Sequence, residues 1–384
     1  MQYRSLGDTG FKPSALGFGT MRLPILRDDD GRPDYTNIDR ASATAMLRRA
    51  IDGGVNYVDT AWMYHGETSE GWLAEALRDG YREKVKIADK MPVWHVNKPT
   101  DFDRILDIQR ERLQAECIDF YLLHSLDATN WRHVLEQRQM AAAERALSDG
   151  RIGHLGFSFY GQPDVFMEIL AATDLWQFCQ IQLNYMDEEF QAGRRGLEAA
   201  AARGLGVVVM EPLRGGALVD DLPPAVRTIW DEAPVHRSPS EWALQWLWSI
   251  PEVSCVLSGM STMQQVEENL QAADRSHPGL LSREEIATVG RVRDAYRDLS
   301  PIACTACRYC LPCPQGVAIP EVLALYNDAR RYGNVARQRL TYSWMRESER
   351  AANCTACRTC EERCPQTIPI SDWMAQIEDE LGAG

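Results

Sequence analysis

Residues 152–171, with the sequence IGHLGFSFYGQPDVFMEILA, contain a short apolar run followed directly by a stretch with helical periodicity. The run Ile152–Phe159 predicts a buried β-strand, and Pro163–Ala171 predicts an amphipathic α-helix. The same unit, a strand and then a helix, recurs on both sides of this segment. Its repetition decides which class of fold the chain can form.

Seven further strands and seven further helices are expected from the same pattern. The strands are Ala15–Met21, Asn56–Ala61, Lys84–Met91, Ile118–Ser125, Phe178–Tyr185, Gly206–Leu213 and Val253–Met260. The helices are Ala41–Gly53, Ser69–Asp79, Phe102–Gln114, Trp131–Asp149, Glu188–Arg203, Ser238–Trp248 and Thr262–Ala273. Eight strands, each followed by a helix, within about 300 residues predict a closed (β/α)8 barrel, or TIM barrel, of the α/β class. A doubly wound sheet usually carries Gly-x-Gly-x-x-Gly after its first strand, and Gly17-Phe18-Gly19 is too short to match.

Polar side chains end several of the expected strands, at the end of a barrel where active sites of this fold lie. Asp59 ends the second strand, Tyr64 follows it, Lys90 ends the third and His124 ends the fourth. A tyrosine is a poor acid near neutral pH unless a neighbouring ammonium stabilises its phenolate. We therefore predict Tyr64 as general acid and base, with Lys90 lowering its pKa. Asp59 would hold the lysine, and His124 would orient a substrate oxygen.

Each of these residues also has an ordinary structural interpretation. Asp59 could cap a helix, Lys90 could be a charge on the rim, and His124 could be a core histidine. Their convergence on one rim of the barrel favours the catalytic interpretation.

Eight of the eleven cysteines lie in two runs near the C-terminus, and both runs end in Cys-Pro. Three cysteines at x2 intervals suit three corners of a [4Fe–4S] cluster, and the fourth, before proline, ligates the other cluster in two-cluster ferredoxins. Two [4Fe–4S] clusters are therefore predicted. The first is assigned to Cys304, Cys307, Cys310 and Cys364, and the second to Cys354, Cys357, Cys360 and Cys313.

Structural zinc is the alternative, but zinc sites usually use two separated Cys-x2-Cys pairs instead of an unbroken triplet. A disulfide framework is disfavoured because residues 1–10 are polar and lack the apolar segment of a signal peptide. The eight cysteines are expected to be reduced and metal-bound in a cytoplasmic protein. Cys117, Cys179 and Cys255 lie singly in apolar runs and are expected to be small core residues.

The cysteine-rich tail differs in composition from the rest of the chain. Residues 301–384 carry nine Arg, no Lys and ten acidic residues, so that most of the formal net charge of −14 lies before them. We expect a barrel domain over residues 1–300 and an iron–sulfur domain over residues 301–384. About 40 residues separate the cysteine runs, and the segments IPEVLALYNDARRYG and IPISDWMAQIEDEL open with a helix-start signal. These features favour an α-helical ferredoxin-like module, in which the clusters transfer electrons or serve only as structural support.

The acidic composition excludes several classes of partner. A net negative charge without a basic stripe argues against nucleic acid and against anionic membranes. No apolar run approaches the length of about 18 residues that a membrane-spanning helix needs. A small-molecule substrate is the expected partner of the barrel.

The segments GVNYVDTAWMYHGETSE, KIADKMP, DFYLLHS and LGFS resemble the aldo-keto reductase superfamily. The resemblance covers residues 1 to about 275. With the cysteine tail, the chain resembles the branch of this superfamily that carries a C-terminal ferredoxin-type domain. The family's catalytic tetrad falls on Asp59, Tyr64, Lys90 and His124.

The resemblance also implies a site for NAD(H) or NADP(H). Ser158 and Gln180 would bind the nicotinamide carboxamide, and Met210 stands where many relatives have a stacking tyrosine. The remaining expected contacts are the turn Pro212, Leu213, Arg214, Gly215 and Gly216 for the pyrophosphate, and Glu268 and Asn269 for the adenine.

Two positions depart from the family pattern. Gly259 and Gln265 replace a lysine and an arginine that NADPH-specific relatives use for the 2′-phosphate, so we expect no strong preference for NADPH. The expected substrate pocket mixes aromatic walls and hydrogen-bonding groups, which suits a partly polar carbonyl compound. Its expected residues are Met21, Trp62, His65, Trp94, His95 and Tyr185.

Together these features predict an NAD(P)-dependent oxidoreductase that interconverts an aldehyde, ketone or sugar-like compound and its alcohol. A nicotinamide moves two electrons as hydride whereas a [4Fe–4S] cluster moves one, so a ferredoxin- or flavodoxin-like electron carrier is an expected partner. Two other functions stay open: a nucleotide-binding subunit for electron transfer or redox sensing, and a redox-neutral isomerase or epimerase.

Overall fold

The computed structural model describes residues 1–28, 30–31, 33–304 and 308–382. Two compact units make up the chain: Met1–Gly215 with Arg237–Arg283, and Gly216–His236 with Glu284–Gly384. The second unit thus contains residues on both sides of the domain boundary expected at residues 300 and 301. Of the described helices, none is long and apolar enough to cross a membrane.

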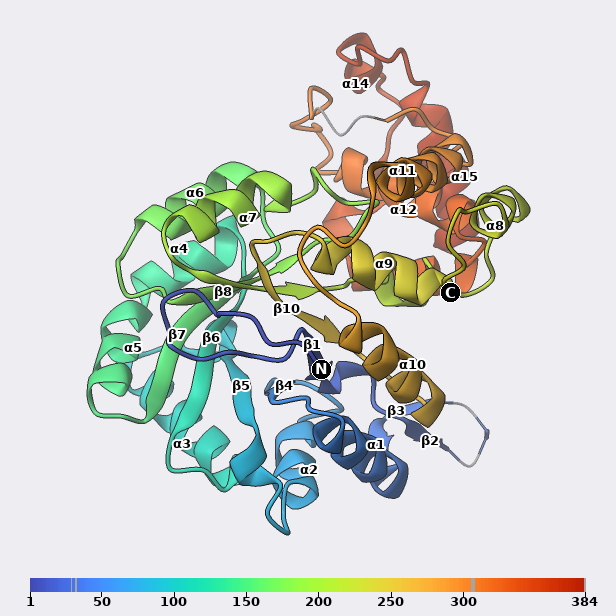
Figure 1. Cartoon of the computed structure of the whole chain (residues 1–384). Coiled ribbons are helices and arrows are strands. Elements are labelled where there is room, and N and C mark those ends of the chain that lie inside the picture. The colour runs from blue at the N-terminus through green and yellow to red at the C-terminus, as the bar shows by residue number, and fades with distance from the viewer. Residues whose placement is uncertain (29, 32, 305–307, 383–384) are drawn as a thin grey trace. The chain divides into compact units, whose positions relative to one another are not determined.

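Eight parallel strands of the first unit close into a barrel in the order β1-β10-β9-β8-β7-β6-β5-β4 (Figure 1). This closure confirms the predicted TIM barrel. The strands are β1 (Leu16–Gly19), β4 (Tyr57–Asp59), β5 (Lys86–Met91), β6 (Ile118–Leu126), β7 (Ile152–Phe159), β8 (Phe178–Gln182), β9 (Gly206–Met210) and β10 (Val253–Ser258).

Helices of the first unit surround the barrel (Figure 1). They are α1 (Arg40–Asp52), α2 (Ser69–Ala76), α3 (Pro99–Leu113), α4 (Ala128–Glu136), α5 (Gln139–Ser148), α6 (Pro163–Ala171), α7 (Gly193–Ala202), α9 (Pro239–Trp248) and α10 (Met263–Asp274). The single helix predicted over Trp131–Asp149 is wrong. Arg138 takes a left-handed conformation (φ 52°), and the first side chain of α5, Gln139, is buried and donates to the Val93 carbonyl at 3.0 Å. A tertiary contact thus ends one helix and starts the next without a proline or glycine.

The barrel interior is filled by every second side chain of each strand. One layer is apolar and consists of Leu6, Tyr57, Ala88, Phe120, Leu122, Phe178, Val208, Cys255 and Leu257. Because side chains alternate along a strand, the residues two positions beyond Tyr57, Ala88 and Phe178 also face the interior. Asp59, Lys90 and Gln180 therefore share the carboxyl end of the barrel.

A hairpin that the sequence pattern did not predict lies between the first two barrel strands in the chain. Strands β2 (Ile25–Arg27) and β3 (Pro33–Ile38) pair antiparallel, with Ile25 opposite Ile38. His65 ties the hairpin to the rim, since its Nδ1 lies 3.1 Å from the Tyr35 carbonyl and its Nε2 lies 2.9 Å from the Thr20 carbonyl.

The second unit is helical, as expected for the cysteine-rich domain. Its helices are α8 (Pro224–Asp231), α11 (Arg283–Asp298, of which Arg283 belongs to the first unit), α12 (Ile319–Arg331), α13 (Val335–Trp344), α14 (Thr359–Glu362) and α15 (Ile370–Leu381). Helices α12 and α15 follow the two Cys-Pro sequences as predicted, whereas α8, α11 and α13 were not predicted.

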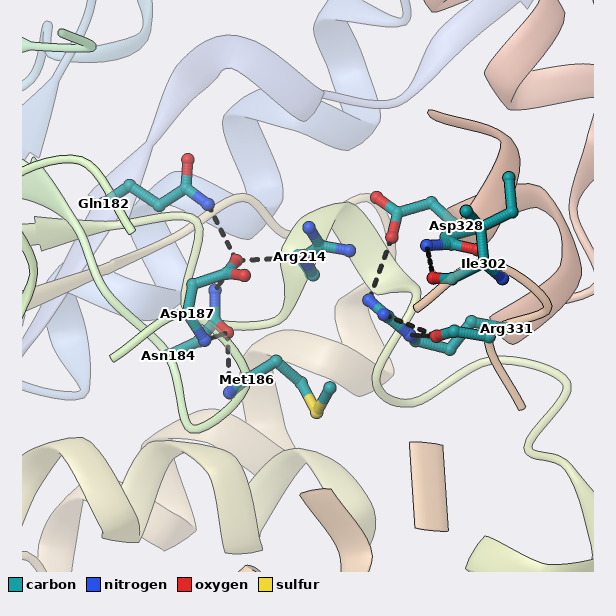
Figure 2. Close-up of polar contacts among 10 residues, drawn as sticks. Gln182, Asn184, Met186, Asp187, Arg214, Ile302, Asp328 and Arg331 are labelled. Carbon is teal, nitrogen blue, oxygen red and sulfur yellow. Dashed lines mark hydrogen bonds and ion pairs between the residues drawn. The ribbon is translucent and has the colours of Figure 1, made fainter. Parts of the chain in front are cut away.

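The apolar core of the second unit holds the chain just before the first cysteine run. Ile302 belongs to this core, and Asn327 of α12 binds both of its peptide groups, donating to its carbonyl at 2.8 Å and accepting from its nitrogen at 3.0 Å. In the same helix Arg331 pairs with Asp328 at 3.1 Å and donates through Nε to Ser300 at 3.0 Å (Figure 2). Helix α12 thereby fixes the approach to Cys304.

Candidate functional site

Lys90 and Asp59 form a buried ion pair at the carboxyl end of the barrel. Lys90 Nζ donates to Asp59 Oδ1 at 2.6 Å and to the Thr60 carbonyl at 2.7 Å. The lysine is 0% exposed and the aspartate 3%. Burial raises the pKa of Asp59, and the Lys90 ammonium opposes this shift. Because removal of one partner would leave a buried charge uncompensated, the pair is held together strongly.

Tyr64 lies in the turn after β4 with its hydroxyl 3.3 Å from Lys90 Nζ. Burial, and then the negative charges of Asp59, Glu211 and Asp89, raise the pKa of Tyr64 well above its usual value. The pKa of Tyr64 is therefore raised overall, in the direction opposite to the lowering expected from Lys90. Tyr64 keeps its proton at neutral pH and can donate it.

His124 lies near the end of β6 and is 6% exposed. Burial, and then the positive charge of Lys90, lower its pKa well below the usual value, so that the imidazole is neutral. Its ring lies 6.3 Å from that of Tyr64 and 5.4 Å from that of Trp94, between ring centroids. Its Nδ1 is buried without a hydrogen-bond partner among the described residues, which fits an atom that can bind a ligand.

Ser158 and Gln180 are neighbours across the β7–β8 ladder and are both buried. Ser158 Oγ accepts the Ser125 backbone N–H at 2.7 Å, and Gln180 Nε2 donates to Met210 Sδ at 3.5 Å. Gln180 Oε1 is buried and has no partner within the described part of the chain. An orphaned carbonyl oxygen at this depth fits a ligand that carries an N–H donor, such as a nicotinamide carboxamide.

The turn after β9 is held by a polar cluster that sequence reasoning missed. Asp187 accepts from Arg214 Nε and from Gln182 Nε2, both at 2.8 Å, and from Asn184 Nδ2 at 3.0 Å (Figure 2). Burial opposes ionisation of Asp187, but Arg214 and the two amides lower its pKa below the usual value. The backbone of Glu211, Arg214 and Gly215 is left-handed, with φ between 51° and 64°. This turn includes Pro212 and Leu213 of the expected pyrophosphate contact.

The side chains of the expected adenosine contacts Gln265, Glu268 and Asn269 are all hydrogen-bonded to nearby residues. Gln265 Oε1 caps α10 by accepting from Ser261 N at 2.8 Å, and Asn269 Nδ2 donates to Ser258 Oγ at 3.1 Å. Glu268 Oε1 accepts from the Gln264 amide at 2.7 Å.

Gly259 packs against the side chain of Arg22, a contact that the sequence pattern did not predict. A Cβ added at Gly259 would lie 3.1 Å from Arg22 Cβ, so the Arg22 side chain crosses the space that a side chain at position 259 would use. Arg22 is exposed and lies in the 3-10 helix after β1.

The six expected pocket residues have different surroundings, and of them Trp94 and His95 lie next to each other. Trp94 packs against His124, whereas Met21 and His95 are exposed and Trp62 stacks under the Arg112 guanidinium at 4.0 Å. His65 is occupied by two carbonyl oxygens, and Tyr185 is buried. Tyr160, just beyond β7, was not predicted. Burial raises the pKa of Tyr160 well above its usual value.

Cysteines of the second unit lie along a hollow and on the apolar core. Cys304, Cys310 and Cys364 line one hollow of about 320 Å³, counting its open mouth, with Pro320, Leu323, Ile368 and Ile370 as apolar walls. Cys307 lies outside the described residues. Cys313, Cys354 and Cys360 each pack against the apolar core of the second unit, and burial raises the pKa of Cys360.

The described residues do not converge on a point where three of them could hold a single metal ion. A cubane cluster spreads its ligands over four corners, and the apolar hollow with three cysteines on its wall fits such a group better than one ion. The three isolated cysteines lie outside these runs. Cys179 and Cys255 are buried in the barrel, as expected for core residues, and Cys117 is half-buried.

The fold and the rim define a barrel enzyme that is joined to a cysteine-rich helical unit. The sequence matches the aldo/keto reductase family over residues 15–293 and the 4Fe-4S dicluster domain over residues 303–368. The chain therefore belongs to the aldo/keto reductase family and is an oxidoreductase with a C-terminal 4Fe-4S domain, which confirms the resemblance seen in its sequence.

Individual relatives are distant. L-galactose dehydrogenase of Arabidopsis thaliana is 25% identical in an alignment of 332 residues that covers 78% of this chain and 97% of the relative. The holo form of aldo-keto reductase AKR11C1 from Bacillus halodurans superposes with a TM-score of 0.62 at 24% identity, over 76% of this chain and 96% of that one. An aldo/keto reductase from Klebsiella pneumoniae in complex with NADP and acetate has a TM-score of 0.62 at 22% identity, over 76% and 96%. These two structures establish the likeness of fold alone.

Proposed function

We propose that this protein is an NAD(P)-dependent oxidoreductase that interconverts a carbonyl compound and its alcohol, with Tyr64 as general acid and base. The observation that carries the proposal is the Tyr64 hydroxyl 3.3 Å from an ammonium that is itself locked by Asp59 at 2.6 Å. Membership of the aldo/keto reductase family supports the same reaction class.

In the direction of reduction, Tyr64 donates its phenolic proton to the substrate oxygen. The phenolate that results is stabilised by the Lys90 ammonium, which Asp59 and the Thr60 carbonyl hold in place. Neutral His124 directs the substrate oxygen toward the phenol. In oxidation the same groups take the proton back.

The nicotinamide cofactor supplies the hydride when it is bound. Ser158 and Gln180 would hold its carboxamide, and Met210 would lie against the ring. The turn Pro212, Leu213, Arg214, Gly215 and Gly216 would bind the pyrophosphate, with Arg214 positioned by Asp187. Glu268 and Asn269 would lie at the adenine, and Gly259 and Gln265 near the ribose.

We propose a small polar carbonyl compound, of the aldehyde, ketone or sugar type, as substrate. The rim combines an aromatic wall, Trp94, with hydrogen-bonding groups on Tyr64 and His124. The similarity to a plant L-galactose dehydrogenase supports a sugar-like alcohol as one member of this class.

The C-terminal domain would hold two [4Fe–4S] clusters with crossed ligands. Cys304, Cys307, Cys310 and Cys364 would bind the first, and Cys354, Cys357, Cys360 and Cys313 the second. Cys364 lines the same hollow as Cys304 and Cys310 of the first run, which supports this connectivity. We propose that the clusters exchange single electrons with a ferredoxin- or flavodoxin-like carrier, and that residues 1–300 and 301–384 are the two functional domains.

Anaerobic purification tests these proposals together. An ultraviolet–visible spectrum and metal analysis would reveal iron–sulfur clusters, and extraction would identify a bound nucleotide or flavin. Reduced nicotinamide cofactor would then be mixed with a panel of aldehydes, ketones and sugars. Cofactor oxidation coupled to formation of the alcohol is the expected result, and a protein that binds the nucleotide without turning over any member would contradict the enzymatic proposal.

A further inference from the structure

Buried polar residues lie on the outer side of strand β5, directly behind Lys90. Because side chains alternate along a strand, Asp89 points toward the helices where Lys90 points into the barrel. Asp89 meets Glu70 of α2 and Gln109 of α3, and all three side chains are 0% exposed. The proposed reaction uses none of the three.

The amide nitrogen of Gln109 has more acceptors around it than it has hydrogens to donate. Its Nε2 lies 2.8 Å from Asp89 Oδ2, 3.0 Å from Glu70 Oε1 and 3.0 Å from the Lys90 carbonyl. An amide nitrogen has two hydrogens and cannot satisfy three acceptors. The Gln109 oxygen is occupied by the Tyr121 hydroxyl. Glu70 Oε1 and Asp89 Oδ2 are thus held at the same nitrogen, and two buried carboxylates placed so close repel each other unless one of them carries a proton.

The charged groups around Glu70 and Asp89 also indicate that only one of the two carboxyls is ionised. From α3, Arg112 Nη1 binds Glu70 Oε2 at 2.8 Å, and its Nη2 reaches Glu67, before α2, at 3.0 Å. From β5, the Lys90 backbone N–H binds Asp89 Oδ1 at 2.8 Å, while its ammonium is bound to Asp59 of β4. Tyr121 of β6 contributes a neutral hydroxyl. One cation therefore neutralises one carboxylate of the pair.

Burial, and then the negative charge of Glu70, raise the pKa of Asp89 well above its usual value. Two carboxylates in contact without water cannot both ionise at moderate pH.

We propose that Glu70 and Asp89 hold one proton between them at neutral pH, and that this pair positions Lys90 and limits the negative charge behind it. Asp89 binds the peptide N–H of Lys90 and Gln109 binds its carbonyl, so the pair and the amide fix the strand that carries the ammonium. The negative charge of Asp89 is among those that raise the pKa of Tyr64. Loss of the shared proton adds one negative charge, and the phenol then gives up its proton less readily.

The influence of the pair on turnover rests on the proposed function of Tyr64. The presence of one proton shared by Glu70 and Asp89 does not depend on that function. Infrared difference spectroscopy of the cluster-loaded full chain tests the count directly. The wild type should show the carbonyl stretch of a protonated carboxylic acid at neutral pH, and Asp89→Asn should lose it. Glu67→Gln, which also touches Arg112 but lies outside the pair, should keep it. A protonated Asp59 would give a band that persists in Asp89→Asn, so loss of the band identifies the pair.

Absence of a protonated-carboxyl band from the wild type, or a band unchanged in Asp89→Asn, would overturn the proposal. Absence of the band from the wild type needs no variant, and so it overturns the proposal even if Asp89→Asn does not fold. In that case a band that is kept in Asp59→Asn supports the proposal, because that variant removes the other buried carboxyl beside Lys90, whereas loss of the band in Asp59→Asn contradicts it.

Stability gives a second measurement. A carboxyl with a raised pKa in the folded state contributes stability at low pH that is lost as the pH rises toward the folded pKa. Asp89→Asn lacks this loss, so its folding equilibrium constant relative to the wild type should grow by up to tenfold per pH unit in this range. A ratio that stays constant with pH contradicts the proposal.

Hydride transfer in Asp89→Asn should lose an alkaline limb that the wild type shows, and an identical pH profile in the two proteins would count against the link to Tyr64. Should the wild type reduce no carbonyl compound, the proposed function fails while the infrared band still decides the proton count.

Discussion

The barrel rim and the cysteine-rich unit use different means to assemble functional groups. The rim collects Asp59, Tyr64, Lys90 and His124 from three strands and a turn, and it locks the lysine at 0% exposure within 2.6 Å of its carboxylate. The second unit carries its cysteines, the proposed cluster ligands, in two short runs, with Cys357 exposed. Proton transfer needs groups that are fixed before the substrate arrives, whereas cluster ligands complete their arrangement when the metal binds.

The largest effect should come from Tyr64→Phe, which tests the role of the pre-positioned side chains at the barrel rim. The ring and its packing stay while the proton donor is removed, so hydride transfer should fall by roughly 10² to 10⁴ while nucleotide binding survives. Single-turnover oxidation of reduced cofactor with an established carbonyl substrate measures it.

Tyr160→Phe is the matched control, since Tyr160 directly follows β7 at the same end of the barrel and has no assigned role. Wild-type turnover in Tyr64→Phe would mean that the tetrad assignment is wrong. A nucleotide-binding subunit for electron transfer would then be the better account.

Lys90→Met should slow the same step because it removes the charge that stabilises the phenolate. Residues that act as a unit are not additive, so the double variant Tyr64→Phe/Lys90→Met should be about as slow as the slower single variant. A double variant slower by the product of the two single effects would show that Lys90 acts apart from Tyr64. Thermal unfolding of each variant controls for the Asp59 carboxylate that Lys90→Met leaves without its partner.

Cofactor preference should be a smaller effect, with NADPH favoured by less than about a hundredfold, or ~2.7 kcal/mol. Gly259 carries no charge, and Gln265 is held as the cap of α10, so neither binds a 2′-phosphate as a cation. Titration of the holoprotein with NADH and NADPH measures the ratio. A larger preference would require another cation. Arg22, which crosses Gly259, and Arg214 are the residues to replace with alanine in that case.

The smallest change, a loss of half the metal, tests the cysteine-rich side of the comparison. Two [4Fe–4S] clusters correspond to about eight irons per chain. Cys313→Ala should reduce this to about four by removing the cluster of Cys354, Cys357 and Cys360. Iron analysis with electron paramagnetic resonance identifies the remaining cluster, and Cys117→Ala should keep all of the iron. Loss of the first cluster instead would disprove the crossed connectivity, and stoichiometric zinc would disprove the iron–sulfur assignment.

Local pattern predicted the barrel because each strand is buried on both faces and each helix has one apolar face. It failed where a tertiary contact overrides local preference, as at Arg138, where buried Gln139 starts a new helix. The Asp187 cluster was missed for a related reason. No motif links Gln182, Asn184 and Arg214 until the loops after β8 and β9 lie together.

The sequence by itself determined the repeat of strands and helices, the two cysteine runs and the identity of the four rim residues, because these depend on periodicity and spacing. The tertiary structure decided the electrostatics of the site. Whether Tyr64 has a raised or a lowered pKa depends on burial and on carboxylates at positions 59, 89 and 211, which approach it only when the barrel closes. The pairing of Glu70 with Asp89 likewise depends on helices α2 and α3 packing against β5, because charge interactions follow distance in space and not separation along the chain.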